Sequence, residues 1–261
     1  MKITIIGAGN MGGATARGLV ANEVVPAQNI TITAAHRESL ESFDVMGMTT
    51  TLDNRFAVTG ADMIILAVKP WIAPKVIEEI KSALNFEKQL IVTMMPGIGN
   101  EDLCSMLGSK NVKVAYVIPN TAIAVGESMT FVAPTTASEQ ETATLVEMFS
   151  HLGKVMQVDY DHLEACMALA SCGIAFALRY IRASSEGGVE LGVKAMQAQE
   201  IVAQTVRGAA ALLEVPNAHA EVEIDKVTTP GGITIKGLNA MEEGGFTASV
   251  IAGLRACKSK L

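Results

Sequence analysis

Three glycines near the start of the chain have the spacing of a phosphate-binding turn. Gly7, Gly9 and Gly12 form G-x-G-x-x-G directly after the apolar run Ile3 to Ile6 and before a helical pattern that continues through Arg17. The first glycine permits a tight turn, the second lets the backbone approach a pyrophosphate, and the third lets helix and strand pack closely. Free N–H groups at the helix start favour the anion. We therefore predict a dinucleotide site, with a purely structural turn as the alternative. Its loop residues are Gly7, Ala8, Gly9, Asn10, Met11 and Gly12.

The next β-rich run, Asn29 to Ala35, lacks the acidic residue that NAD-selective sites place at the strand end to hold the ribose 2′-hydroxyl. His36 and Arg37 follow it instead. A carboxylate would repel a 2′-phosphate, whereas the Arg37 guanidinium can pair with one in two-pronged geometry, and Ala34 leaves room for it. The sequence favours NADP over NAD, unless Arg37 merely marks a solvated helix start.

A proline and two glycines interrupt the helical pattern near the end of the chain. In TTPGGITIKG, Pro230, Gly231 and Gly232 break one helix, and another begins at Ile233. In one interpretation the turn holds a ligand, because glycines expose the backbone and the new helix presents unpaired N–H groups. In the other, a threonine before Pro230 caps the helix, the proline lies in its first turn and the glycines form a hinge. The residues alone leave both open.

Strands alternate with helical patterns in the first part of the chain, which predicts a mostly parallel, doubly wound sheet. The β-rich runs are Lys2–Gly9, Asn29–Ala35, Ala61–Pro70, Lys88–Gly97, Val112–Ile118, Ser128–Pro134 and Lys154–Asp159. After Asp159 such runs disappear, and Ala, Met, Leu and Glu dominate. The predicted fold is an α/β Rossmann-type doubly wound sheet, residues 1–159, followed by an all-α domain, residues 160–261.

One of these runs ends in Leu66 to Pro70 at the carboxyl edge of the sheet. Folds of this kind bind their ligands at that edge. Lys69 is therefore a candidate contact to the cofactor, and an ordinary surface lysine is the alternative.

Composition narrows the class of protein. The 261 residues are 49% hydrophobic and 18% charged with a net charge of -7, and no long basic run is present, so nucleic acid is not an expected partner. The four cysteines fit neither a zinc site nor a disulfide framework, and we expect reduced, buried thiols and no metal. Glycines interrupt the apolar start of the chain, so no secretory signal is expected, and the predicted location is cytoplasmic.

A chargeless stretch of 14 residues, Ala165 to Leu178, lies in the helical part. A membrane span needs about 20 residues, so a buried helix is favoured and no membrane partner is expected. A small helical domain has limited interior of its own. We therefore predict that a second subunit covers this helix in a homodimer or higher homo-oligomer, with burial inside one subunit as the alternative.

Motifs along nearly the whole chain resemble the pyrroline-5-carboxylate reductase family, enzymes that reduce a cyclic imine with NADPH to make proline. The N-terminal IGAGNMG is generic to dinucleotide folds, whereas the Pro-Gly-Gly-x-Thr segment is specific to this family. The matching segments are IGAGNMG, AVKP at Ala67–Pro70, IPNTAIAVGES at Ile118–Ser128, EGGVELG at Glu186–Gly192, VTTPGGITIKGL at Val227–Leu238 and GGF at Gly244–Phe246.

The resemblance implies three groups of site residues. On the adenosine side of NADPH it places His36, Arg37, Asn54, Ala67, Val68, Lys69 and Pro70. Near the nicotinamide it places Met94, Met95, Pro96 and Asn120. For the substrate it implies Gly231, Gly232, Ile233 and Thr234, to which we add Asn120. It also implies dimers in which the long helix of one subunit packs on another.

With that family in view, the turn has a chemical interpretation. Backbone N–H groups from Ile233 onward could hold the substrate carboxylate, and the Thr234 hydroxyl could cap the helix or accept a hydrogen bond from the iminium N–H, which makes it the candidate catalytic residue. A protonated imine is already electrophilic, so positioning is most of the work.

Three departures from the family pattern bear on substrate identity. ASCGIAF, Ala170 to Phe176, stands for Ser-Gly-Ser-Gly-Pro-Ala-Tyr, IPNTA for MPNTP, and Met95-Pro96-Gly97 for Ala-Ala-Gly. The expected reaction is reduction of 1-pyrroline-5-carboxylate to L-proline. The alternatives are a reductase of another cyclic imine or carbonyl compound, and an inactive NADP-binding sensor or scaffold.

Overall fold

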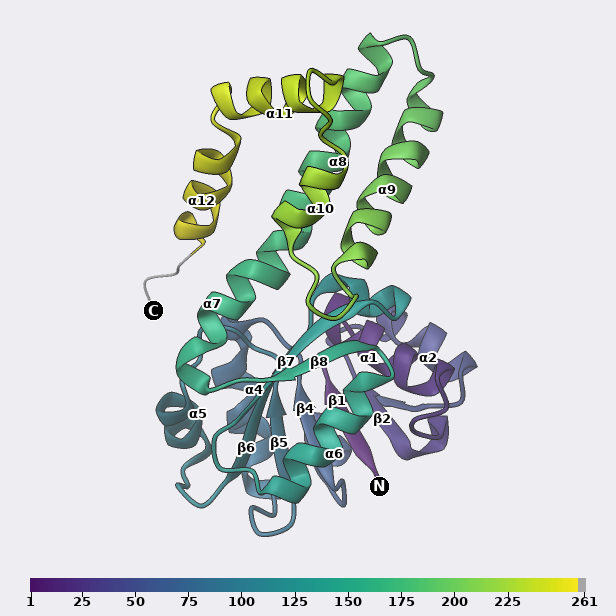
Figure 1. The fold of residues 1–261 in the computed structure, drawn as a ribbon. Helices are drawn as coiled ribbons and strands as arrows, with labels where there is room; N and C mark the ends of the chain where they lie inside the picture. The colour runs from purple at the N-terminus through teal and green to yellow at the C-terminus, as the bar shows by residue number, and fades with distance from the viewer. Residues whose placement is uncertain (258–261) are drawn as a thin grey trace. The chain divides into compact units, whose positions relative to one another are not determined.

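The structure, a computed structural model, describes residues 1–257 and separates into two units (Figure 1). The sheet unit comprises residues 1–171, and the helical unit begins at Cys172. This division falls later than Asp159 because the helical segment after the last strand still packs on the sheet, where Leu163 is buried and Met167 and Ala170 lie against the same core. The domain boundary at Asp159 stays a prediction.

An eight-stranded sheet forms the sheet unit, in the order β3-β2-β1-β4-β5-β6-β7-β8. All neighbouring strands are parallel except β6 and β7. The prediction of a mostly parallel, doubly wound sheet is thus confirmed. The strands are β1 Ile3–Ile6, β2 Ile30–Thr33, β3 Thr49–Thr51, β4 Met63–Leu66, β5 Leu90–Thr93, β6 Lys113–Ile118, β7 Ser128–Pro134 and β8 Gly153–Gln157.

The sequence did not predict β3. Its three threonines carry no apolar run, and the strand lies at the edge of the sheet, where one side has no neighbour to bury. Only its pairing with β2, Thr31 opposite Thr49 and Thr33 opposite Thr51, identifies it.

Helices cover both faces of the sheet and bury a core on each (Figure 1). One core takes side chains from α1 Asn10–Ala21, α2 Glu41–Val45 and α6 Glu139–Ser150. The other takes them from α3 Asn54–Val58, α4 Ala73–Ile80, α5 Asn100–Leu107 and α7 Leu163–Met167. Strands buried on both faces need the near-continuous Val, Ile and Leu runs that the sequence contains.

The sheet places the predicted cofactor residues together at one edge. Because β1 to β6 run in the same direction, the loops that follow them emerge at a shared carboxyl edge. Strands β7 and β8 run the opposite way and end at the other edge.

Five helices make up the described part of the helical unit, and little of it is buried within the chain. They are α8 Gly173–Glu190, α9 Ala195–Leu212, α10 Ala220–Lys226, α11 Ile233–Glu243 and α12 Phe246–Ala256. Helices α8 and α9 pack closely, since a side chain at Gly188 would lie 3.1 Å from the Ala198 Cβ. Among apolar residues of this unit that the structure describes, only Ala198 is buried, whereas Met196 and Ile233 are each 88% exposed.

The chargeless stretch belongs to a longer helix than the sequence suggested. By length and composition, the helix Tyr160–Glu190 is the one helix in the described chain that could cross a membrane, and 6% of its most apolar window is buried. The alternative, burial of this helix inside one subunit, is therefore wrong, because the chain supplies too few side chains to cover it. A short π-helical segment, Ala168–Cys172, interrupts this helix.

The expectation of buried thiols is also wrong. Cys104, Cys166, Cys172 and Cys257 are all free and all partly exposed.

Candidate functional site

The glycine loop after β1 is shaped by close backbone contacts. Gly7 has a φ of +110°, which side chains rarely permit, and a Cβ on it would lie 2.8 Å from the Ala67 carbonyl oxygen. A Cβ on Gly12 would lie 2.9 Å from that of Ala67 and would collide with the Gly7 carbonyl. The lack of a side chain at these two glycines therefore lets β1, α1 and the end of β4 pack closely, as the motif requires.

Gly9 differs from both, because a Cβ there would meet no atom within 4 Å. It precedes α1, which has no side-chain cap and no acidic residue in its first turn. The first N–H groups of a helix lack acceptors within it. An anion thus has open space and unpaired donors at this point, and the residues fit a pyrophosphate.

The first two backbone N–H groups of the glycine loop already have an acceptor within the protein. The Gly7 and Ala8 N–H groups both donate to the Thr33 carbonyl at the end of β2, at 3.1 and 2.8 Å. The donors that remain for a phosphate begin at Gly9, and Asn10, Met11 and Gly12 follow it.

Arg37 lies beyond the end of β2 and is exposed, as the NADP prediction requires, but its side chain already has two partners within the protein. Its guanidinium donates to the Thr50 hydroxyl at 2.7 Å and forms an ion pair with Asp44. The Arg37 side chain is still 54% exposed. The neighbouring His36 is exposed, and Ala34 is partly buried. Sequence reasoning missed Asp44, which lies on α2, and Thr50, which reaches Arg37 because β3 pairs with β2.

Asn54 begins α3 and connects β2 with α4. Its amide oxygen accepts from the Thr33 hydroxyl, and its amide nitrogen donates to the Glu79 carboxylate, each at 2.8 Å. Asp53 caps the same helix by accepting from two N–H groups of its first turn. The orientation of the Asn54 side chain is thus held from two elements.

The segment after β4 adjoins the glycine loop directly. Val68 lies 3.1 Å from a Cβ built on Gly7, and Lys69 is exposed. The Lys69 ammonium lies 5.9 Å from the centroid of the Trp71 ring, and that ring is 75% exposed. Pro70 starts the short turn Pro70–Ile72 that leads into α4. Trp71 is a further candidate contact that the motif-based reasoning did not include.

The three residues after β5 divide between core and surface. The Met94 side chain enters one core and accepts a weak hydrogen bond from Thr15, whereas Met95 is fully buried in the other. Only Pro96 is exposed. A cofactor at this edge can therefore meet Pro96 and the backbone, and not the Met95 side chain.

Asn120 is 5% exposed, and both ends of its amide are used inside the protein. Its oxygen accepts from the Ala122 N–H at 3.1 Å, and its nitrogen donates to the Ala170 carbonyl at 3.4 Å. The side chain therefore positions the loop after β6. A role in binding nicotinamide or substrate stays a prediction.

The Pro-Gly-Gly turn precedes a helix as the sequence indicated. Gly231 has a φ of +72°, Gly232 is the N-cap residue of α11, and Ile233 is its first residue. No side chain caps the helix, and its first turn has no acidic residue. The alternative that places Pro230 in the first turn is thus wrong.

The threonines before the turn have other contacts. The Thr228 hydroxyl donates to the Ile224 carbonyl at 3.1 Å and so closes α10, and does not cap α11. The Gly232 N–H donates to the Thr229 carbonyl at 2.9 Å, so the unpaired amides begin at Ile233. A side chain at Gly232 would lie 2.6 Å from the Thr229 hydroxyl. Thr234, in the first turn, is exposed.

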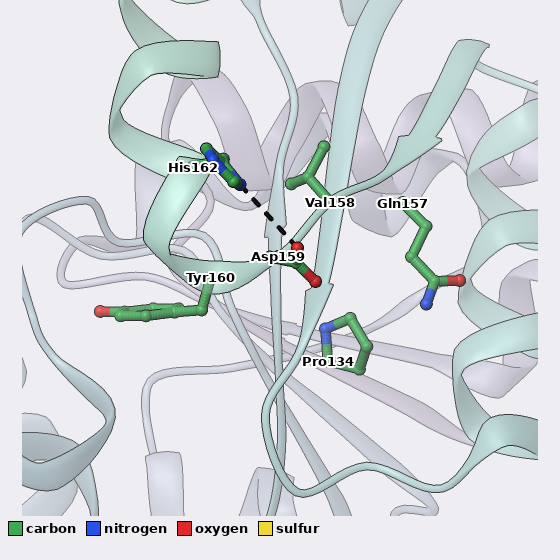
Figure 2. Close-up of a pocket in the computed structure, with 6 residues that line it drawn as sticks. All are labelled: Pro134, Gln157, Val158, Asp159, Tyr160 and His162. Atoms are coloured by element: carbon green, nitrogen blue, oxygen red, sulfur yellow. Dashed lines mark ion pairs between the residues drawn. The ribbon is translucent and has the colours of Figure 1, made fainter.

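An open pocket of about 460 Å³ lies elsewhere in the sheet unit (Figure 2). Its lining comes from the ends of β7 and β8 and the turn that follows, with Pro134, Gln157 and His162 among it. These strands end opposite the edge that carries the glycine loop. His162 and Asp159 are 3.9 Å apart and largely exposed. None of the predicted site residues lines this pocket.

The largest pKa shift among the described residues is that of Tyr116, a core residue that is not among the predicted site residues. Burial, followed by the neighbouring Tyr160, raises the pKa of Tyr116 far above its ordinary value of 10.0. The Tyr116 hydroxyl donates to the Ile98 carbonyl at 2.8 Å, and the two tyrosine rings meet edge to face at 4.8 Å. Tyr116 therefore stays a neutral hydrogen-bond donor.

Among the described residues, no group of three His, Cys, Asp or Glu side chains could hold a metal ion.

Two family models match the chain, one in each part. Residues 2–97 match the family described as NADP oxidoreductase coenzyme F420-dependent, and residues 161–261 match pyrroline-5-carboxylate reductase dimerisation. The second match assigns the helical unit to a dimerisation family, in agreement with its exposed apolar side chains.

Relatives match over nearly all of the chain. Pyrroline-5-carboxylate reductase 1 of Dictyostelium discoideum is 35% identical over 99% of this chain, which spans 49% of that protein's length. The pyrroline-5-carboxylate reductase of Arabidopsis thaliana is 34% identical over 99% of this chain and 94% of its own length. The crystal structure of Plasmodium falciparum pyrroline carboxylate reductase with NADP bound has a TM-score of 0.90 at 23% identity and covers 98% of this chain and 95% of that one, which shows the shared fold. This chain belongs to the pyrroline-5-carboxylate reductase family.

Proposed function

We propose that this chain reduces 1-pyrroline-5-carboxylate to L-proline with NADPH as the hydride donor. The observation that carries the proposal is that two helices begin after a glycine N-cap, α1 after Gly9 and α11 after Gly232. Neither helix has a side-chain cap or an acidic residue in its first turn. Helix N-termini of this kind bind anions. The reaction needs two such sites, one for a pyrophosphate and one for a carboxylate.

NADPH would bind along the carboxyl edge of the sheet. The amides from Gly9 to Gly12 hold its pyrophosphate, Arg37 pairs with its 2′-phosphate, and Asn54 and Ala67 to Pro70 adjoin its adenosine. The cofactor supplies a hydride. The exposed Pro96 and the backbone of Met94 and Met95 are the contacts for the nicotinamide side.

The turn before α11 would bind the imino acid. Amides from Ile233 onward hold the substrate carboxylate, and the small Gly231 and Gly232 leave the backbone accessible. The Thr234 hydroxyl accepts a hydrogen bond from the iminium N–H and so stabilises the charge that makes the carbon electrophilic. No strong general acid is needed, because the imine nitrogen is protonated before the hydride arrives.

The exposed apolar surface of the helical unit implies that the active form is a homodimer or a larger homo-oligomer. Large side chains such as Leu191, Met196 and Ile233 are more than four-fifths exposed in the isolated chain. Large apolar side chains exposed in such number are characteristic of an interface between subunits. Covering it with a second copy also buries the long apolar helix.

The test is oxidation of NADPH by the purified protein with pyrroline-5-carboxylate, repeated with NADH and with the six-membered-ring imino acid. Turnover with the five-membered ring and NADPH supports the proposal. Faster turnover with the larger ring favours the alternative substrate that the altered Ala170–Phe176 segment suggests. NADPH binding without oxidation by any imine would identify an inactive sensor.

A further inference from the structure

Two cysteines that are distant in sequence are neighbours in the helical unit. Cys172 immediately precedes α8, and Cys257 immediately follows α12. Burial, followed by the neighbouring Cys257 thiol, raises the pKa of Cys172, and both cysteines are free. The sequence spacing did not indicate this pairing.

Helix packing accounts for the juxtaposition. Figure 1 shows α8 and α12 running in opposite directions. A side chain at Gly253 on α12 would meet the Phe176 ring on α8 at 3.5 Å, so the absence of one lets the helices approach. Cys172 is one turn before Phe176, and Cys257 is one turn after Gly253. In an antiparallel pair, those offsets bring the two cysteines to the same level.

The backbone at both cysteines has ordinary dihedral angles. Cys172 ends the π-helical segment, and Cys257 follows α12. Their φ and ψ are -78° and -37° at Cys172 and -78° and -10° at Cys257, in ordinary allowed regions. Both side chains are partly exposed in the isolated chain. Of the other two cysteines, Cys104 is on α5 in the sheet unit and provides a matched control.

We propose that Cys172 and Cys257 form a reversible intramolecular disulfide when a peroxide is present. One thiol loses its proton, and the thiolate attacks an oxygen of hydrogen peroxide. The O–O bond breaks, the sulfur becomes a sulfenic acid, and the departing hydroxide takes up the released proton and leaves as the first water. The second thiol attacks that sulfur, the S–S bond forms, and the second water leaves. Two electrons pass from the sulfurs to the peroxide, and a dithiol reductant reverses the step.

The disulfide would close a loop that contains nearly all of the helical unit. A cross-link of this length restricts the unfolded chain more than the folded one. Oxidation is therefore expected to raise the melting temperature of the helical unit by on the order of 5 °C, and reduction to restore the original value. The link also ties the C-terminal helix to the start of α8, which follows the π-helical segment.

The experiment uses the full-length protein, treated with hydrogen peroxide, blocked with an alkylating reagent and digested for peptide mass mapping. The expected result is one linked peptide pair that contains Cys172 and Cys257, lost after dithiothreitol. Cys172→Ser and Cys257→Ser each abolish the link and the rise in melting temperature, whereas Cys104→Ser retains both. Circular dichroism of each variant establishes that it is folded.

Three outcomes would overturn the inference. They are two free thiols after oxidation of the folded protein, oxidation that stops at sulfenic or sulfinic acid, and a disulfide between two copies of the chain. None of these depends on whether the chain reduces pyrroline-5-carboxylate.

Discussion

The side-chain amide of Asn120 joins the loop after β6 to the π-helical segment, because its nitrogen donates to the carbonyl of Ala170 at 3.4 Å. A π-helical turn leaves carbonyl groups without their usual partners in the helix. Asn120 provides one such partner from a loop fifty positions earlier in the chain. The family's PNT motif and the altered ASCGIAF segment are therefore in direct contact.

Removing that amide should destabilise the protein. Asn120 is 5% exposed, and Asn120→Ala removes the partner of the partly buried Ala122 N–H and Ala170 carbonyl, so we expect a loss of about 2–4 kcal/mol in the free energy of unfolding. Urea denaturation measures it. Thr121→Ala, at an exposed position of the same turn, is the control and should change little. Unchanged stability with a large loss of turnover would instead make Asn120 a ligand-binding residue.

Cofactor preference should respond in opposite directions to two charge changes beside β2. Arg37→Ala removes the proposed partner of the 2′-phosphate and should raise the KM for NADPH by about thirtyfold while leaving that for NADH nearly unchanged. Asp44→Asn removes the carboxylate that pairs with Arg37 and should lower the KM for NADPH a few-fold. Steady-state kinetics with both cofactors distinguish these cases. Equal changes for NADPH and NADH would contradict a 2′-phosphate contact.

Trp71 offers a direct optical test of where NADPH binds. It is the single tryptophan of the chain, and it follows the segment that packs on the glycine loop. Reduced nicotinamide absorbs where tryptophan emits, so NADPH bound at this edge should quench the emission and gain emission of its own. Fluorescence titration measures both, and Trp71→Phe provides the blank. Undiminished Trp71 emission at saturating NADPH would place the cofactor elsewhere.

Thr234 should affect the chemical step and not cofactor binding. Thr234→Ala removes the proposed acceptor for the iminium N–H, and kcat should fall about ten- to a hundredfold. The Kd for NADPH, measured by calorimetry, should stay the same. Thr234→Ser keeps the hydroxyl and should retain most of the activity. Normal turnover by the alanine variant would refute the role, as would a parallel loss of NADPH binding.

Stability at low pH should depend on Glu141. Burial acts to raise the pKa of this carboxyl, but the hydrogen bonds from Lys113 and Ser138 outweigh it, and the pKa in the folded state lies below the ordinary 4.5. The stabilisation is therefore present above the unfolded-state pKa and is lost as the pH falls through the folded-state value.

The variant that tests this is Glu141→Gln. It should lower the free energy of unfolding by about 1 kcal/mol near neutral pH and by much less at about pH 3. Urea unfolding at both pH values measures the difference. Glu139→Gln, in the same first turn of α6, lacks the reciprocal contacts with Ser138 and is the control. A cost that does not change with pH would mean that the charge of Glu141 contributes nothing.

Patterns local in sequence were sufficient for much of the fold. Apolar runs identified every strand except β3, whose threonines resemble a loop until they pair with β2. The helix start at Ile233 followed from Pro230 and two glycines, since backbone dihedrals and missing N–H donors act within a few residues. The glycine loop could be recognised for the same reason.

The partners of individual side chains could not be predicted from the sequence, because they depend on contacts between distant segments. Spacing alone could not indicate that Arg37 donates to Thr50, since their meeting follows from the pairing of the short edge strand β3 with β2. It also could not indicate that Met95 is buried while Pro96 is exposed, which depends on the helices packed over β5.

By itself, then, the sequence determined the order of the elements other than β3, the glycine loop, the turn before α11 and the family, all of which follow from short-range stereochemistry or from motifs. The tertiary structure alone decided which amides of the glycine loop stay unpaired, that the Asn120 side chain is committed to Ala170, and that Cys172 lies beside Cys257. The physical reason is that hydrogen-bond partners and thiol neighbours are set by packing between elements, and packing is a property of the whole folded chain.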